Sequence, residues 1–117
     1  MNHKKLEVWI KSMELVEEVY MLTNLFPKSE EFGLKSQMRR AAISIPSNIS
    51  EGAGRSSIKE NIRFLNIANG SIAELETQII ISEKLEFVAS KELILDKLRV
   101  VRKLNNGLKK YLTKKII

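Results

Sequence analysis

The sequence of 117 residues has no cysteine and only one histidine. Without cysteine the chain has no disulfides, thiolate zinc ligands or thiol nucleophile, which suits a reducing compartment. The one histidine, His3, lies in a terminus expected to fray, so neither a His-based metal cluster nor a Ser-His-Asp triad is expected. These absences predict a protein that is not an enzyme and that holds no metal and no cofactor.

Long apolar runs are also missing. No window approaches the roughly 20 apolar residues that cross a bilayer, and Glu7 and Lys11 interrupt the first apolar turns, so no signal-peptide core is expected. We therefore expect a cytoplasmic protein with no membrane partner. A chain of this length can bury a core without disulfides or metals, which predicts one domain over residues 1–117.

Positive charge is concentrated near the end of the chain. Residues 91–117 contain nine Lys or Arg against two acids, which gives +7, whereas residues 1–90 contain eleven against twelve, which gives −1. All the excess of the net charge of +6 therefore lies in the last quarter of the sequence. Such an asymmetry favours a polyanionic partner.

Apolar residues recur at spacings of three and four along four stretches, the pattern of amphipathic helices. The predicted helices run from about 6 to 26, 34 to 53, 58 to 87 and 91 to 113. Pro27 ends the first helix, Gly52 and Gly54 end the second, and Ser57 with Glu60 forms a capping box at the start of the third. Four such helices with short links predict an all-α fold, an antiparallel up-and-down four-helix bundle.

Two segments carry a resemblance to a known family. They are SIPSNISEG at residues 44–52, followed by Arg55, and AELETQ at residues 73–78. Together with Val8-Trp9 and Phe26-Pro27 upstream, they resemble the 23S ribosomal RNA intervening-sequence proteins over most of residues 6–87. Ser50 stands where that family more often has alanine, a small change that threatens neither the helix nor assembly.

The resemblance implies a small helical bundle that assembles as a ring-like homopentamer. A similar bundle is the accessory protein of diversity-generating retroelements, in which a basic pentamer associates with nucleic acid and a reverse transcriptase. The family therefore implies self-association and contact with RNA or DNA, and names no reaction.

The first predicted helix is apolar over more than half of its circumference. One small core does not need that much apolar surface, so a contact between copies is the natural use of the remainder. The alternative is a deeply packed core helix.

The fourth predicted helix carries a strip of cations on the side opposite its apolar residues. We call this the basic strip: Arg99, Arg102, Lys103, Lys109 and Lys110. Lysine and arginine gain affinity for phosphates by counterion release, so the strip predicts binding to the RNA or DNA backbone. Tyr111 lies near the inward side, so base stacking is not indicated on this helix. The alternatives are a charged surface that maintains solubility and a structural oligomer that recruits a protein partner.

A few polar residues fall on otherwise apolar or ordered stretches. Glu76 lies close to the core line of its helix, where a buried carboxylate needs a partner. Arg40 is the expected partner, unless Glu76 lies on a solvated margin. A further polar set is expected either to form a second polar surface or to line subunit junctions: Gln37, Arg40, Ser44, Asn48 and Arg55. The Gly52–Ser57 turn could hold phosphate at a helix start, although a plain turn is the better interpretation.

Overall fold

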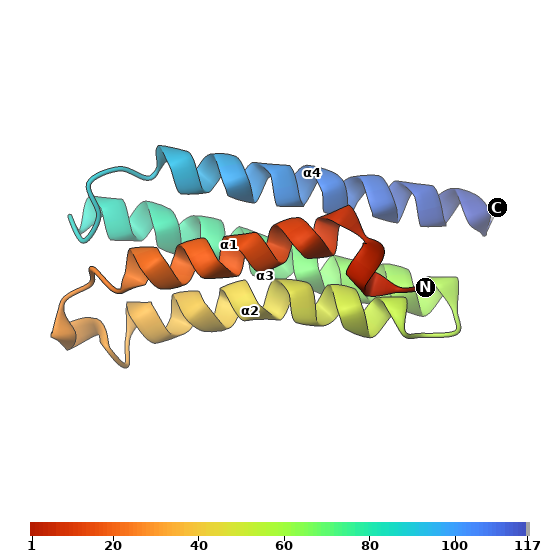
Figure 1. Ribbon diagram of the computed structural model, residues 1–117, viewed down its shortest axis with the longest axis horizontal. Helices are drawn as coiled ribbons and strands as arrows, with labels where there is room; N and C mark the ends of the chain where they lie inside the picture. The colour runs from red at the N-terminus through yellow and green to blue at the C-terminus, as the bar shows by residue number, and fades with distance from the viewer. Residues whose placement is uncertain (117) are drawn as a thin grey trace.

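The computed structural model describes residues 1–116, and every regular element in that range is helical. The four main helices are α1 (Glu7–Thr23), α2 (Leu34–Ala53), α3 (Ile58–Lys84) and α4 (Glu92–Lys115). Short 3-10 helices occupy His3–Lys5 and Lys28–Glu30. The four long helices lie side by side along the longest dimension of a molecule of 48 × 24 × 20 Å (Figure 1). The predicted all-α class with four helices is confirmed.

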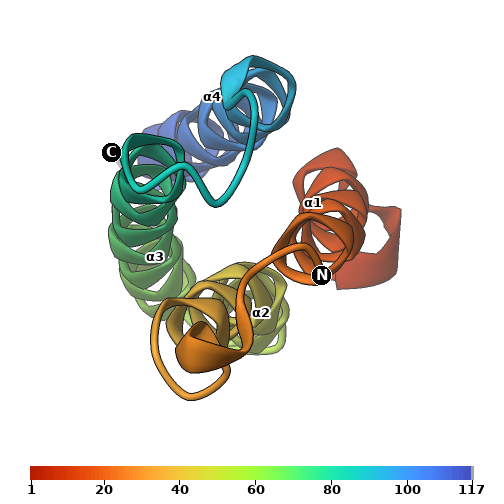
Figure 2. The same ribbon diagram turned by 90° about the vertical axis from the view of Figure 1, so that its left-hand side faces the viewer.

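Each helix packs against two neighbours. α1 contacts α2 and α4, and α3 contacts the same two helices from the other side. Figure 2, which looks along the helices, shows α2 and α4 at opposite sides of the molecule. The core residues recur every three or four positions, as the sequence predicts. They include Leu15 and Val19 of α1, Met38, Ile45 and Ile49 of α2, Leu65, Ile72, Leu75 and Ile79 of α3, and Leu98 and Val101 of α4.

α1 ends at Thr23, earlier than the predicted Phe26. The hydroxyl of the buried Thr23 donates to the carbonyl of Val19 at 2.7 Å, and the amide of Phe26 donates to the carbonyl of Thr23 in a tight four-residue turn. This turn directs the ring of Phe26 onto Phe87, with 5.4 Å between the ring centroids. The chain therefore leaves the helix before Pro27 requires it.

α3 ends at Lys84, before the predicted Phe87. Glu86 adopts a positive φ of 61°, and the amide of Phe87 reaches back to the carbonyl of Ser82 at 2.9 Å. This is the pattern of a helix that stops through a left-handed residue, usually glycine. The sequence does not reveal the stop, because a glutamate occupies that position.

The start of α3 follows half of the predicted capping box. Ser57 accepts a hydrogen bond from the amide of Glu60 at 3.3 Å. The Glu60 carboxylate turns instead toward Arg63, whose Nε lies 2.9 Å away. One of the unpaired amides at the helix start is therefore capped by a side chain.

α2 and α3 approach each other closely at Gly52. A Cβ added at Gly52 would lie 2.9 Å from Cβ of Phe64 and 3.0 Å from the carbonyl oxygen of Asn61. Further along, the hydroxyls of Ser44 and Ser71 are 2.8 Å apart and link the two helices. None of the helices described in residues 1–116 is long and apolar enough to span a bilayer.

Candidate nucleic-acid interface

α4 presents the basic strip along the side that does not face the core. The side chains of Arg99, Lys103 and Lys110 are exposed, whereas Arg102 and Lys109 are half-buried. At 100° per residue, the exposed three share one line along the helix, and the half-buried two lie together on one side of it. The sequence pattern thus places its five cations on one continuous surface.

Two of the five cations are already paired with acids. Arg99 contacts Asp96 of its own helix at 2.8 Å. Arg102 donates two hydrogen bonds to Glu76 of α3, from Nη2 to Oε1 at 3.0 Å and from Nη1 to Oε2 at 3.2 Å. This charge-assisted pair lowers the pKa of the Glu76 carboxyl, while its partial burial acts in the opposite direction. The N-terminal half of the strip therefore has much of its charge balanced within the chain.

Glu76 does not pair with Arg40, so that sequence prediction is wrong. The Glu76 line of α3 faces α4, because Asn69, two turns earlier, is bonded to Asn105 and Asn106 of α4. Arg40 is exposed on α2. Helical spacing placed Glu76 near the core but could not tell which neighbour it faces.

The three asparagines between α3 and α4 form a polar cluster that the sequence analysis missed. Asn105 is 0% exposed. Its amide nitrogen donates to the carbonyl of Leu65 at 3.0 Å and to the side-chain oxygen of Asn69 at 2.8 Å. Its own side-chain oxygen is buried without a partner among the described residues. The sequence did contain a sign of this cluster: Asn105 falls on the inward line of α4, and a buried side-chain amide needs hydrogen-bond partners.

The C-terminal half of α4 differs from the N-terminal half. We define the α4 lysine surface as Lys103, Lys109, Lys110, Lys114 and Lys115. None of these lysines forms an ion pair with an acid of residues 1–116, whereas Lys91 and Lys97 nearer the start of α4 pair with Glu83 and Glu18. Lys115 lies over the ring of Tyr111, with 4.8 Å between its Nζ and the ring centroid. Tyr111 is exposed, so the expectation that it lies near the inward side of the helix is wrong. Unbalanced positive charge therefore gathers toward the end of the helix.

The remaining sequence-selected residues make contacts inside the chain. Asn48 donates to the carbonyl and the hydroxyl of Ser44 at 2.8 and 2.9 Å. Arg55 is exposed, pairs with Glu51 at 3.3 Å and lies over the ring of Phe64. The structure does not bring Arg40, Asn48, Arg55 and Glu76 together as one site. Their role at a subunit junction stays a prediction.

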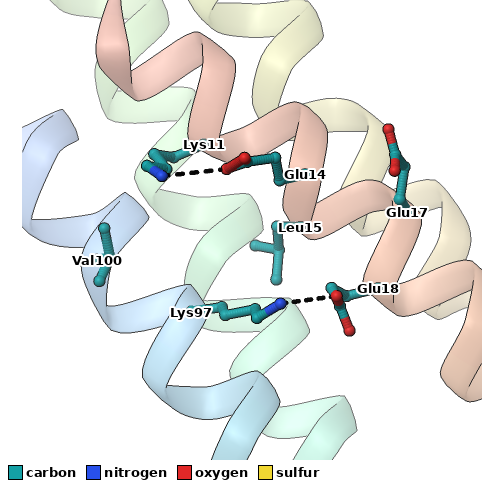
Figure 3. Close-up of a pocket in the computed structure, with 7 residues that line it drawn as sticks. All are labelled: Lys11, Glu14, Leu15, Glu17, Glu18, Lys97 and Val100. Atoms are coloured by element: carbon teal, nitrogen blue, oxygen red, sulfur yellow. Dashed lines mark hydrogen bonds and ion pairs between the residues drawn. The ribbon is translucent and has the colours of Figure 1, made fainter.

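A hollow of about 450 Å³ lies between α1 and α4. Figure 3 shows Leu15 between two ion pairs, Lys11 with Glu14 at 3.4 Å and Lys97 with Glu18 at 2.7 Å. Each lysine of this hollow is held by a carboxylate, so the hollow does not extend the basic strip. No group of three or more metal-ligating side chains is found in the part of the chain that the structure describes.

Fold and surface together define a class: a small all-α protein of four helices with cations along the last one. Residues 4–107 match the family described as 23S rRNA-intervening sequence protein. Because this match covers most of the chain, the protein belongs to that family. No curated protein matches the sequence. The resemblance drawn from residues 44–52 and 73–78 is confirmed at the family level, and the link to diversity-generating retroelements stays a prediction.

Proposed function

We propose that this protein is a non-enzymatic, self-associating helical bundle that binds the backbone of RNA or DNA through α4. The observation that carries the proposal is the α4 lysine surface, which no acid of residues 1–116 neutralises. Unpaired lysines displace the counterions that are condensed on the phosphates of a nucleic acid, and the release of these counterions favours binding without demanding a base sequence.

Self-association is the second part of the proposal. α1 leaves Ile10, Met13 and Met21 exposed, and Leu25, in the turn that follows it, is 72% exposed. Apolar side chains that gather on one helix are typical of a contact surface rather than of solvated protein. We propose an antiparallel up-and-down bundle that closes into a homopentamer, as the family resemblance implies. A ring would repeat the α4 lysine surface and raise the local positive potential.

The second candidate function is a structural oligomer that recruits a protein partner and does not bind nucleic acid. The observation that favours it is the pairing of Arg99 with Asp96 and of Arg102 with Glu76. These cations already have partners, so part of the basic strip would serve solubility and packing. The apolar face of α1 would then hold the partner.

Charge removal separates the two candidates. In one variant the five strip residues Arg99, Arg102, Lys103, Lys109 and Lys110 are replaced by Gln, and binding to labelled RNA and DNA duplexes is measured by fluorescence anisotropy at low salt. The proposal predicts that binding is abolished while the particle size in light scattering is unchanged. A matched control removes five cations from other parts of the chain: Lys5, Lys28, Lys59, Arg63 and Lys84.

The control variant has the same change in net charge, so it should retain most of the affinity. Equal weakening in both variants would mean that net charge and not α4 determines binding. Unchanged binding in the strip variant would refute the α4 surface. An absence of binding by the unmodified protein would favour the scaffold. A monomer in light scattering would contradict the self-association.

A further inference from the structure

A groove away from α4 is lined by aromatic rings and by arginines that no acid of the described residues pairs with. It has a volume of about 480 Å³ and lies against α1 and α2. We call it the Tyr20–Phe32 groove, and its lining includes Tyr20, Phe32, Lys35, Arg39, Arg40 and Ile43. α2 and α4 lie at opposite sides of the molecule, so the groove is separate from the basic strip (Figure 2).

Phe32 is 96% exposed, the largest exposed fraction among the large apolar residues described. It lies in the link between the 3-10 helix Lys28–Glu30 and α2. An isolated apolar side chain on a surface needs no explanation, but Phe32 borders a groove that Tyr20 and Ile43 also line. The groove therefore combines two accessible aromatic rings with aliphatic surface.

Arg39 is held against one of these rings. Its Cζ lies 4.2 Å from the centroid of the Tyr20 ring. Its Nε donates to the Thr23 hydroxyl at 2.9 Å, and its Nη2 donates to the Asn24 side-chain oxygen at 2.9 Å and to the Tyr20 carbonyl at 3.3 Å. These contacts use only Nε and Nη2 of Arg39, so the guanidinium is fixed in advance and its Nη1 remains available to donate to a phosphate.

The charge of the groove is positive. Lys35 is balanced by Glu31 at 3.1 Å. The acceptors of Arg39 are all uncharged, and neither Arg39 nor Arg40 forms an ion pair with an acid of residues 1–116. A protein partner would have to supply carboxylates for both arginines, whereas a nucleic-acid strand brings phosphates at every nucleotide.

We propose that the Tyr20–Phe32 groove binds single-stranded nucleic acid, with a base stacked on Phe32 and phosphates on Arg39 and Arg40. A positive groove with aromatic rings is the combination that single strands require, because each base offers a π-face and each linkage a charge. A duplex keeps its bases stacked inside, so it gains little from Phe32. This groove adds base stacking, which the sequence of α4 did not indicate.

The test compares two probes with the same number of phosphates: an oligothymidine of about 12 nucleotides and an abasic strand of the same length. Phe32→Ala should weaken binding of the oligothymidine roughly ten-fold and leave the abasic strand unaffected. Phe32→Trp should restore the affinity, since it returns an aromatic face. Leu85→Ala is the matched control, because Leu85 is another exposed apolar side chain, follows α3, and lies outside the groove, α1 and α4. It should change the affinity for neither probe.

Three results would overturn the proposal: unchanged oligothymidine affinity in Phe32→Ala, equal weakening of both probes, or a smaller particle in light scattering. The last would assign Phe32 to a contact between copies of the chain. The strip variant distinguishes the two proposals. If the strip variant binds oligothymidine fully and Phe32→Ala binds it weakly, the α4 proposal fails and the groove proposal stands. If the strip variant binds oligothymidine weakly and Phe32→Ala binds it fully, only the groove proposal fails.

Discussion

Gly52→Ala should destabilise the protein, although alanine is the better helix former. In an exposed helix the substitution gains about 0.5–1 kcal/mol. At Gly52 the new methyl group would meet Cβ of Phe64 at 2.9 Å and the backbone carbonyl of Asn61 at 3.0 Å. Neither atom is the end of a flexible side chain, so α2 and α3 must separate locally. Overpacking of this kind costs about 1–3 kcal/mol, which leaves a net destabilisation of about 1 kcal/mol.

Gly70→Ala is the matched control, because a Cβ at Gly70 meets nothing within 4 Å. It should stabilise α3 by about 0.5–1 kcal/mol. The two variants make the same chemical change in helices, and their free energies of unfolding should differ by about 2 kcal/mol in total. Urea unfolding followed by circular dichroism measures this, at one fixed protein concentration because association would shift the midpoint. If Gly52→Ala unfolds at the same or higher urea than the unmodified protein, α2 and α3 do not approach as described.

Three further perturbations test other local features. Glu86→Gly should raise the free energy of unfolding by about 0.5–1 kcal/mol in urea titration, because glycine adopts the left-handed conformation without strain; a decrease would contradict the helix stop described. Asn105→Ala should cost about 2 kcal/mol, since two buried hydrogen bonds disappear, and a cost near zero would mean that the cluster contributes no stability. Arg102 holds the pKa of Glu76 below its ordinary value of 4.5, so the pair stabilises the fold above that pH, and this stability disappears as the pH falls through the folded-state pKa. At neutral pH the free energy of unfolding of the unmodified protein should therefore exceed that of Glu76→Gln by up to about 1 kcal/mol, and this difference should shrink as the pH falls below the ordinary carboxyl range. A difference that does not depend on pH would refute the pairing.

Helical periodicity predicted the four helices because the same spacing that fills a core also marks a helix in the sequence. Ile45, Ile49 and Ile72 are buried where that spacing places them. Helix ends were less predictable, because they depend on contacts between elements. Thr23 and Phe26 leave α1 early to reach Phe87, and no local signal in α1 reports that contact.

The sequence predicted where the basic strip lies on α4, but not which of its cations are paired with acids. Spacing alone placed Arg99, Lys103 and Lys110 on one exposed line of α4. The pairing of Arg102 with Glu76 depends on how α3 and α4 are rotated about their axes, which one-dimensional spacing does not specify. The Tyr20–Phe32 groove was not predictable either, because its lining comes from two helices and the link between them.

The salt dependence of nucleic-acid binding tests the central claim most directly. For a DNA duplex, the slope of log affinity against log salt changes by about 0.9 for each phosphate that the protein no longer neutralises. Replacing Lys103, Lys109 and Lys110 by Gln should therefore make the slope shallower by about 2–3 per binding protomer. Replacing the acid-paired Arg99 and Arg102 should change it by less than about 1. Equal slopes for the unmodified protein and the lysine variant would contradict the account.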